Sequence, residues 1–392
     1  MVKVLMFAAG PFVPVREGTD RFIYDVARFL NAQSDLELTL VIRDDQGRVA
    51  AADYAGICRH VEKIQPGHAL FRYLNLLAAR CGVSVFEGLG FALGMRKRFR
   101  TLAECADVVI LNYAIWFPLL CASFRRRKVI CNTLDLTYYR RASMRGTETK
   151  LKRLAVWLSK FFELRVLRSF RKITVLGEYE KQMLEGSGFP SGQVLQVGMP
   201  IEGRILTADP VKREFDFLLI GAKDQVNVDA ALDFFAKVVP LLGGRTYRMA
   251  LVGSVCNNSI WDKPEIVPAN IDLVRLGFVD RMEDAIARAR IGVSTVPRGS
   301  GIKVKSVEMI LRGLPLVTTD HGIEGIPATT EGIINIDRAS DDEIRERLTS
   351  WLSDPLEAAR VGRDQAEKVA MAFAPETALA GLLQSIREMA SK

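Results

Sequence analysis

The segment spanning residues 297–327 carries the residue types best suited to binding a phosphorylated ligand. Gly301, Lys303 and Lys305 stand where a short helix is expected to begin, with Ser300 as its N-cap. Two cations at the positive end of a helix dipole are unfavourable unless a negative group lies beside them. Backbone N–H groups at a helix start, a glycine backbone that permits close approach and two ammonium groups together form a phosphate cradle. We therefore expect an anion at this position; the alternative is a surface helix whose lysines are solvated.

The expected helix runs from about residue 301 to 312 and stops at a glycine. Lys305 and Glu308 are three residues apart, so they share one edge of this helix. A carboxylate only accepts hydrogen bonds, which suits Glu308 to ribose hydroxyls rather than to a phosphate. A second glycine loop, with Gly322 and Glu324, follows the next expected strand. Together the two loops favour a ligand site over a solvated helix.

This segment resembles the donor-nucleotide region of GT-B glycosyltransferases of family four, in the variant whose loop reads Gly-Ser-Gly-Ile-Lys-x-Lys-x-x-Glu. Three upstream segments also resemble the family and occur in the same order. Residues 215–242 resemble the first strand and helix of the family's C-terminal domain, residues 248–254 its second strand, and residues 273–297 the run before the donor loop. The resemblance implies transfer of a sugar from a nucleotide diphosphate sugar, with retention of configuration. The residues that it assigns to donor binding are Gly18, Gly221, Ser300, Gly301, Lys303, Lys305, Glu308, Gly322 and Glu324.

Alternating strand and helix patterns along all 392 residues predict an α/β fold with parallel sheets, and the length allows two domains. The resemblance implies the GT-B fold, in which two Rossmann-like domains face each other across a cleft and the last helix crosses back to the first domain. A polar stretch between residues 199 and 215 separates the two patterns. We therefore assign residues 1–205 to an acceptor-binding domain, 206–373 to a nucleotide-sugar-binding domain and 374–392 to the returning helix.

The first half is expected to contain seven strands and six helices. The strands lie near residues 2–8, 36–43, 57–64, 107–111, 128–132, 172–176 and 193–197, and the helices near 19–32, 67–80, 84–104, 114–124, 148–169 and 178–186. Residues 70–95 are apolar but contain charged side chains, so we interpret them as one or two helices rather than a membrane span. Residues 1–15 are interpreted as the first strand rather than a secretion signal, because they lack a small-residue cleavage pattern.

Ligands of open α/β sheets bind beyond the carboxyl ends of strands, so residues after each strand are the candidates in the first half. Gly18 and Arg21, at the start of a helix with Thr19 as its expected N-cap, resemble the family loop Gly-Gly-x-x-Arg, of which one glycine is kept. Asp135 resembles an acidic family position, although capping of a local turn is an equal alternative. Glu163 is interpreted as structural. The expected catalytic residues are Lys305, Asp135 and Arg21.

No metal or redox cofactor is expected. The six cysteines show no Cys-x-x-Cys spacing and the three histidines are scattered, which favours a reducing cytoplasm without a metal centre. No Gly-x-Gly-x-x-Gly follows the first strand of either half, which argues against an NAD-dependent oxidoreductase. Gly221 is followed by Ala222, Lys223 and Asp224 rather than by the Arg and Lys of the family pattern. This departure makes Lys303 and Lys305 more important for neutralising the diphosphate of a UDP-, GDP- or dTDP-sugar.

The formal net charge of +8 is concentrated in the first half, in basic clusters at residues 96–100, 125–128, 140–141 and 150–153. Basic groups that alternate with aromatic residues such as Trp157 suit an anionic lipid surface. Solvated basic faces, or contact with an acidic or protein acceptor, are the alternatives. No nucleic-acid recognition motif accompanies the charge. We expect a cytoplasmic enzyme with a glycan, lipid-linked or protein acceptor, and peripheral attachment to the inner face of the membrane is a further hypothesis.

Two other function classes stay open at this point. A nucleotide-sugar epimerase of the same fold would keep the diphosphate site but would need several acid/base groups, and no histidine stands at an expected place. A non-catalytic nucleotide-sugar binder would share the site without transferring the sugar. Analysis of the reaction products separates both from a glycosyltransferase.

Overall fold

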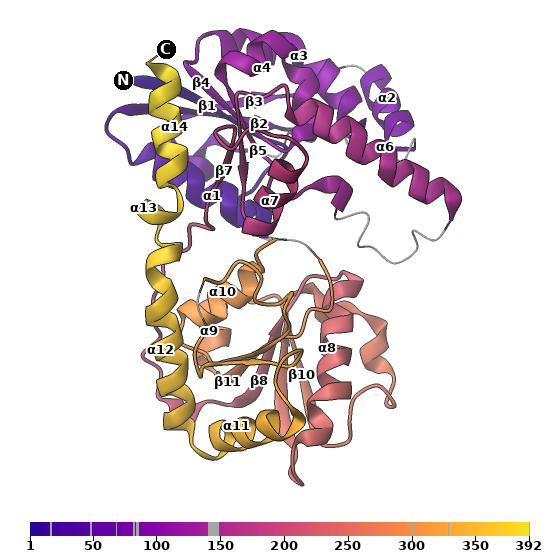
Figure 1. Cartoon of the computed structure of the whole chain (residues 1–392), viewed down its shortest axis with the longest axis vertical. Helices are drawn as coiled ribbons and strands as arrows, with labels where there is room; N and C mark the ends of the chain where they lie inside the picture. Colours follow the sequence, from indigo (N-terminus) through magenta and orange to yellow (C-terminus); the bar gives the residue numbers. More distant parts are fainter. Residues whose placement is uncertain are drawn as a thin grey trace. The chain divides into compact units, whose positions relative to one another are not determined.

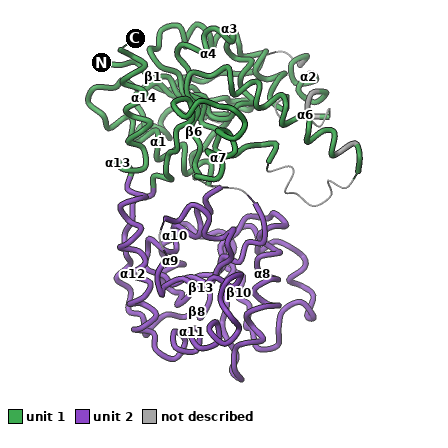
Figure 2. Tube along the Cα trace, viewed as in Figure 1, with its two compact units in different colours: residues 1–200, 375–392 green, residues 201–374 purple. Residues whose placement is uncertain are grey.

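The structure, a computed structural model, describes residues 1–15, 18–47, 49–67, 69–80, 83, 86–139, 149–299, 301–327 and 329–391 (Figure 1). The chain forms two compact units, unit 1 of Met1–Pro200 with Pro375–Lys392 and unit 2 of Ile201–Ala374 (Figure 2). Each unit has one sheet, in which the paired strands run parallel. The predicted fold class of two Rossmann-like sheets is confirmed.

Unit 1 contains a seven-stranded sheet in the order β3-β2-β1-β4-β5-β6-β7. The central strands are apolar runs buried on both faces, as in the fully buried β4, because helices cover a parallel sheet on each side. The strands are β1 (Val2–Ala8), β2 (Leu36–Arg43), β3 (His60–Ile64), β4 (Val108–Asn112), β5 (Val129–Asn132), β6 (Lys172–Val175) and β7 (Val194–Gln196).

The helices of unit 1 pack around this sheet through a mainly apolar core. Phe7 of β1 meets the rings of Phe99 and Trp116 edge-on, with centroids 5.4 and 5.3 Å away. The helices are α1 (Gly18–Asn31), α2 (Ala69–Arg80), α3 (Leu89–Glu104), the 3-10 helix η3 (Ala114–Leu119), α4 (Ala122–Lys128), α6 (Lys150–Leu167), α7 (Glu178–Gly186), α13 (Pro375–Ala378) and α14 (Ala380–Ala390).

Unit 2 contains a six-stranded sheet in the order β10-β9-β8-β11-β12-β13. Its core includes an edge-on contact between Phe217 and Phe234, with ring centroids 5.0 Å apart. The strands are β8 (Phe215–Ile220), β9 (Tyr247–Val252), β10 (Ile271–Gly277), β11 (Ala289–Ser294), β12 (Leu316–Thr318) and β13 (Ile333–Asn335). The helices are α8 (Gln225–Lys237), α9 (Met282–Ala287), α10 (Val304–Leu311), α11 (Asp341–Ser353) and α12 (Pro355–Phe373).

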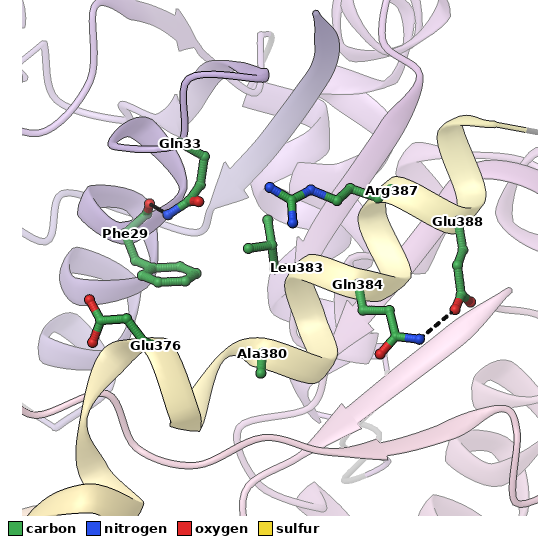
Figure 3. A pocket seen from close by; sticks show the side chains of 8 residues that line it. All are labelled: Phe29, Gln33, Glu376, Ala380, Leu383, Gln384, Arg387 and Glu388. Atoms are coloured by element: carbon green, nitrogen blue, oxygen red, sulfur yellow. Dashed lines mark hydrogen bonds between the residues drawn. The ribbon is translucent and has the colours of Figure 1, made fainter.

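The last helix of the chain belongs to unit 1, as the predicted fold class requires. Arg387 of α14 donates two hydrogen bonds to the carboxylate of Asp35, at 2.8 and 2.9 Å. Residues of α1, α13 and α14 line a groove of about 520 Å³, in which Phe29 and Leu383 supply apolar surface (Figure 3). The C-terminal segment is thus held to the first unit by an ion pair and by apolar contact.

In each sheet the strand order reverses beside the first strand of that unit. The reversal lies between β1 and β4 in unit 1 and between β8 and β11 in unit 2. Connections on the two sides of such a point lead to opposite faces of the sheet, which is why open α/β sheets bind ligands there. The segments that follow these four strands are therefore the main candidates for ligand contact.

The helix predicted for residues 114–124 is wrong. Residues 114–119 form the 3-10 helix η3, and α4 begins only at Ala122. Pro118 lies inside η3, and Leu120 is extended with φ −132°. Proline has no N–H for a helical hydrogen bond, so the chain cannot continue as one α-helix. The helix predicted from residue 84 likewise begins later, at Leu89.

Arg125, from a basic cluster expected to face an anionic surface, has a structural role instead. It is 7% exposed, donates a 2.7 Å hydrogen bond to Ser169 and also donates to the main-chain oxygens of Phe117 and Leu120. Burial lowers the pKa of its guanidinium. The predicted cluster at residues 140–141 lies outside the described residues. The surface charge of unit 1 is therefore smaller than the sequence suggested.

Candidate functional site

The carboxyl ends of β8 and β9 are held together by glycine contacts. Gly253 has φ 95°, and a Cβ on it would lie 2.4 Å from the carbonyl oxygen of Gly221. A Cβ on Gly221 would lie 2.9 Å from the side chain of Asn227, in the first turn of α8. Only glycine permits these approaches. Gly221 therefore lies directly against a helix start, where free N–H groups favour an anion.

The helix α10 begins later than predicted. Its N-cap is Lys303, so the assignment of Ser300 as the N-cap is wrong; Ser300 itself lies outside the described residues. Gly301 has φ 72°, a left-handed conformation that a right-handed helix cannot contain. The cap makes no side-chain hydrogen bond, because an ammonium group accepts none. The first-turn N–H groups of α10 thus receive no acceptor from the side chain of their cap.

Lys303 and Glu324, both expected to contact the donor, contact each other in this structure. Lys303 Nζ donates a 2.6 Å hydrogen bond to the carbonyl oxygen of Gly301 and lies 3.7 Å from Glu324 Oε2. The two side chains are 14% and 21% exposed. The first and second glycine loops are therefore joined by a mostly buried ion pair.

Lys305 lies between the starts of two helices. Its Nζ donates a 2.5 Å hydrogen bond to Asn227 Oδ1, and Asn227 in turn donates from Nδ2 to Asp224, the N-cap of α8, at 2.9 Å. Burial lowers the pKa of Lys305 to about 8, with a further small lowering by Lys303 and an opposing effect of Asp224. The N-terminal end of α8 and that of α10 thus meet at one ammonium group.

Arg298 is a cation of this region that the sequence reasoning missed. It follows β11 by a few residues, and its Nη2 donates a 2.5 Å hydrogen bond to Asp229 Oδ2 on α8. Asp229 also accepts a 2.9 Å hydrogen bond from Gln225. Its position directly after a buried strand, at the point where the strand order reverses, was the available signal.

Gly322 occupies a position that admits no side chain. A Cβ there would lie 2.1 Å from the carbonyl oxygen of Ser294 and 2.2 Å from Thr318 Oγ1. Its N–H donates a 3.1 Å hydrogen bond to Thr319 Oγ1. The second glycine loop is therefore packed tightly onto the carboxyl ends of β11 and β12. This packing restricts the position of Glu324, which follows Gly322 by two residues.

Glu308 lies one turn after Lys305 on α10 and is half-buried. Its main-chain oxygen accepts a 3.3 Å hydrogen bond from Arg312, whose guanidinium also donates to Glu283 at 2.5 Å. The predicted shared edge of Lys305 and Glu308 is present, because both lie on α10 three residues apart. The role of the Glu308 carboxylate stays a prediction.

The unit 1 candidates Gly18 and Arg21 both lie in the first turn of α1. Because the helix begins at Gly18, Thr19 is within it and is not its N-cap; Thr19 Oγ1 instead lies 3.1 Å from the hydroxyl of Tyr113, which follows β4. Arg21 Nε donates a 2.5 Å hydrogen bond to Asp25. Tyr113 has φ 70°, which is rare for a non-glycine residue, and the sequence reasoning missed it. Strained backbone conformations are common at functional sites. Tyr113 therefore makes the strand-order reversal of unit 1 a second candidate for ligand contact.

Asp135 is half-buried in the segment after β5, which Glu163 anchors. Glu163, 1% exposed, accepts hydrogen bonds from the N–H and hydroxyl of Thr137 at 3.0 and 2.5 Å and from the N–H of Tyr138 at 2.9 Å. Burial raises the pKa of Glu163 to about 7, although these hydrogen bonds oppose the rise. A buried carboxylate from α6 thus holds the segment that carries Asp135.

The described residues hold no group of three or more His, Cys, Asp or Glu side chains arranged to bind a metal ion.

Solved structures with the same fold span nearly the whole chain. Sucrose-phosphate synthase from Thermosynechococcus elongatus has a TM-score of 0.68 and 13% identity, with 100% of each chain covered. TarM from S. aureus, in complex with UDP and other ligands, has a TM-score of 0.70 and 10% identity over 98% of this chain and 100% of that one. HepE from Anabaena, in complex with UDP and glucose, has a TM-score of 0.65 and 13% identity over 99% and 100%. No curated protein matches the sequence.

The two sheets, the returning C-terminal helix and these structural matches define the GT-B fold. The matching family model is described as glycosyl transferases group 1 and covers residues 214–354, which include the glycine loops, α8 and α10. The match lies within unit 2, and the predicted resemblance to this family is confirmed for these residues. Its members transfer a sugar from a nucleotide sugar, so the donor belongs to that class of compound.

Lys305→Met is expected to stabilise the unliganded protein at pH 7 by about 1 to 3 kcal/mol. The pKa of Lys305 falls from 10.5 to about 8 on folding, so the folded state binds this proton less tightly than the unfolded state. The penalty is complete below pH 8 and disappears as the pH rises from 8 toward 10.5. Thermal unfolding at pH 7 and pH 10 measures it, with Lys223→Met, an exposed lysine, as the control. An equal gain at both pH values would contradict the burial of the charge.

Proposed function

We propose that the protein transfers a sugar from a UDP-sugar to a lipid-linked or otherwise membrane-proximal glycan acceptor. The observation that carries the donor part is Lys305, whose ammonium lies between the starts of α8 and α10 beside the glycine at the end of β8. Buried cations at helix starts favour a phosphorylated ligand. The UDP present in the TarM and HepE structures supports uridine as the nucleoside.

In the proposed reaction, the bond between the sugar and the diphosphate breaks, the oxygen of the acceptor hydroxyl forms the new bond to the sugar, and the hydroxyl proton leaves with the diphosphate. Negative charge grows on the departing diphosphate, so groups that are placed to meet this charge lower the barrier. We assign this role to Lys305, with Lys303 and the first-turn N–H groups of α8 and α10 in support. Because these cations are available, the proposed transfer is metal-independent, and the resemblance to family four favours retention of configuration.

The contact between Lys303 and Glu324 suggests how the donor is received. The two charges compensate each other at 3.7 Å. A bound diphosphate attracts Lys303 more strongly than one carboxylate does, because it carries more negative charge. Glu324 is then free to accept hydrogen bonds from the hydroxyls of the transferred sugar, and Glu308 takes the ribose hydroxyls.

Unit 1 is proposed to bind the acceptor. Asp135 and Arg21 follow or adjoin the carboxyl ends of β5 and β1, and we assign them to the acceptor or to the transferred sugar. The exposed basic residues Arg96, Lys97 and Arg98 of α3 support peripheral attachment to an anionic membrane surface. Each such group contributes about 1 kcal/mol near an anionic surface, and salt weakens this contribution. We therefore propose that the enzyme acts at the cytoplasmic face of a membrane.

Lys305→Met is expected to lower the affinity for UDP about ten- to one-hundred-fold at pH 7, or about 1.5 to 3 kcal/mol. The affinity of the parent protein should also weaken above pH 8, where the free lysine loses its proton, whereas that of the variant should not. Titration calorimetry at pH 7 and pH 9 measures both effects, with Lys368→Met, an exposed lysine of α12, as the control. An unchanged affinity in a folded Lys305→Met variant would remove Lys305 from the site.

Glu308→Gln is expected to weaken binding of UDP about ten-fold while leaving binding of its 2′-deoxy analogue close to that of the parent. The physical reason is that an ionised carboxylate is a stronger acceptor for a ribose hydroxyl than an amide oxygen is. Competition titrations with the two nucleotides give the ratio directly. Equal losses for both would show that Glu308 acts on the structure of α10 rather than on the ribose.

Asp135→Asn and Arg21→Ala are each expected to abolish sugar transfer and to leave UDP affinity nearly unchanged, because both residues belong to unit 1. The measurement is mass spectrometry of products formed from UDP-sugars and a lipid extract, with Arg28→Ala on the exposed side of α1 as the control. Full activity in either variant removes that residue from the site. Formation of an epimerised UDP-sugar without a glycosylated product would identify an epimerase and overturn the proposed function.

A further inference from the structure

The helix α2 presents its apolar stripe to the outside of unit 1. Residues at i, i+3, i+4 and i+7 form one face of a helix, and in a globular protein an apolar face of this kind normally packs on the core. In α2 this face is exposed: the fractions are 61%, 59%, 37% and 40% for Leu70, Tyr73, Leu74 and Leu77. The orientation of α2 is therefore the reverse of that expected for a surface helix of a water-soluble protein.

The opposite face of α2 is held to α3 by backbone contact. A Cβ on Gly90 of α3 would lie 2.2 Å from the carbonyl oxygen of Phe71 and 2.3 Å from the N of Asn75. A Cβ on Gly94, four residues later, would lie 1.9 Å from the carbonyl oxygen of Pro66, just before α2. Glycine at both positions lets the backbones approach closely. The backbone of α2 thus packs closely on α3, and the apolar side chains of its stripe lie outside this contact.

A second outward apolar stripe lies on α6. Leu154, Trp157 and Phe161, at i, i+3 and i+7, are 52%, 60% and 50% exposed, and the last two rings are stacked with centroids 6.0 Å apart. The next residue, Phe162, contacts Phe86 in the segment between α2 and α3 at 5.2 Å. The two helices are therefore connected through this segment, and Figure 1 shows both at the margin of unit 1.

The charge on both helices is positive. α2 carries the exposed Arg72 and Arg80, and its sequence contains no carboxylate. α6 carries exposed Arg153 and Lys160, and the one carboxylate in its sequence, Glu163, is buried. Apolar stripes flanked by cations, with Tyr and Trp among them, match an anionic lipid surface. A protein partner would have to supply both an apolar groove and compensating carboxylates.

The length of α2 distinguishes lying in a membrane from crossing it. Its 12 residues span about 18 Å, less than the roughly 30 Å of a hydrocarbon core. Among the helices of the described residues, none is long and apolar enough to cross a bilayer. An amphipathic helix of this length fits the plane of the interface, with its apolar side chains in the outer acyl region.

We propose that α2 inserts its apolar stripe into an anionic phospholipid surface, together with Trp157 and Phe161 of α6. This inference rests on the proposed membrane attachment and goes further, from adsorption through charge to insertion of named side chains. The two differ in their response to salt: high salt releases a charge-bound protein, whereas inserted apolar groups keep part of it bound.

Trp157 provides a direct reading of insertion. The other three tryptophans, Trp116, Trp261 and Trp351, are 2%, 6% and 3% exposed, so a change in fluorescence on binding reports mainly Trp157. With vesicles of equal parts phosphatidylcholine and phosphatidylglycerol, its emission should shift to the blue and be quenched by brominated acyl chains. In a Trp157→Phe, Tyr73→Trp double variant, the emission of the tryptophan at position 73 should likewise shift to the blue and be quenched, which reports insertion of α2.

The decisive variant is the triple substitution Leu70→Gln, Tyr73→Gln, Leu74→Gln. It should lose salt-resistant vesicle binding by about ten-fold or more. The matched control is the triple substitution Val211→Gln, Leu356→Gln, Met371→Gln in unit 2, where the exposed fractions are 59%, 62% and 74%; it should bind vesicles as the parent does. UDP affinity, measured for every protein, shows that each is folded and reports the donor site separately.

The inference is overturned if residue 73 is not quenched, or if the α2 triple variant binds vesicles at high salt as well as the parent. Binding at low salt alone would then leave charge-based attachment and the donor function standing. It is also overturned if light scattering without lipid shows a dimer that the α2 substitutions dissociate, because the stripe would then bind a second copy. Insertion in a protein that binds no UDP would uphold the inference and contradict the proposed function.

Discussion

The ammonium group of Lys305 is the constraint around which the starts of α8 and α10 in unit 2 are arranged. Lys305 is half-buried and donates a hydrogen bond to the neutral oxygen of Asn227, which in turn donates to Asp224. Burial disfavours its charge, which is why its pKa lies near 8. A site that keeps a cation ready for an anion at the expense of stability is a common feature of binding and catalytic centres. The glycine contacts at Gly221 and Gly253 are what bring α8 close enough to provide this oxygen.

The other charges of the region are compensated in pairs. Arg298 pairs with Asp229 at 2.5 Å and Lys303 with Glu324 at 3.7 Å. The short pair joins the loop after β11 to α8 and gives this loop a fixed position. The longer pair has a weaker mutual attraction. Unit 2 therefore combines a short charge pair with a longer and weaker one.

Unit 1 uses buried polar groups for a different purpose. Asn112, Asn132 and Thr174 form a chain of side-chain hydrogen bonds of 2.9 and 2.6 Å across the carboxyl ends of β4, β5 and β6. Glu163 then fixes the segment beyond β5 through three accepted hydrogen bonds. Buried networks of this kind favour a single arrangement of the strand ends, since a buried polar group left without a hydrogen-bond partner would destabilise the fold. The segment that carries Asp135 is consequently placed by α6, the same helix that presents Trp157 to the outside.

The sequence by itself determined the elements and residue types that depend on short-range order. The strands at residues 2–8 and 36–43 were predicted with the bounds observed, because each is a continuous or alternating apolar run that few other conformations satisfy. The family and the two lysines were recognised from a local motif, and the fold class followed from the alternation of strands and helices. The roles of the site residues stay predictions.

Tertiary structure decided what depends on partners far away in the chain. Lys305 and Asn227 are 78 residues apart and Arg298 and Asp229 are 69 apart, so no periodicity connects them. The start of α10 at Val304 depended on the left-handed backbone of Gly301, and the 3-10 form of η3 on Pro118 in its place against the core. The apolar stripe of α2 could be identified from spacing, but its direction could not. A helical period shows that an apolar face exists, and only the backbone packing of Gly90 and Gly94 shows that this face points outward.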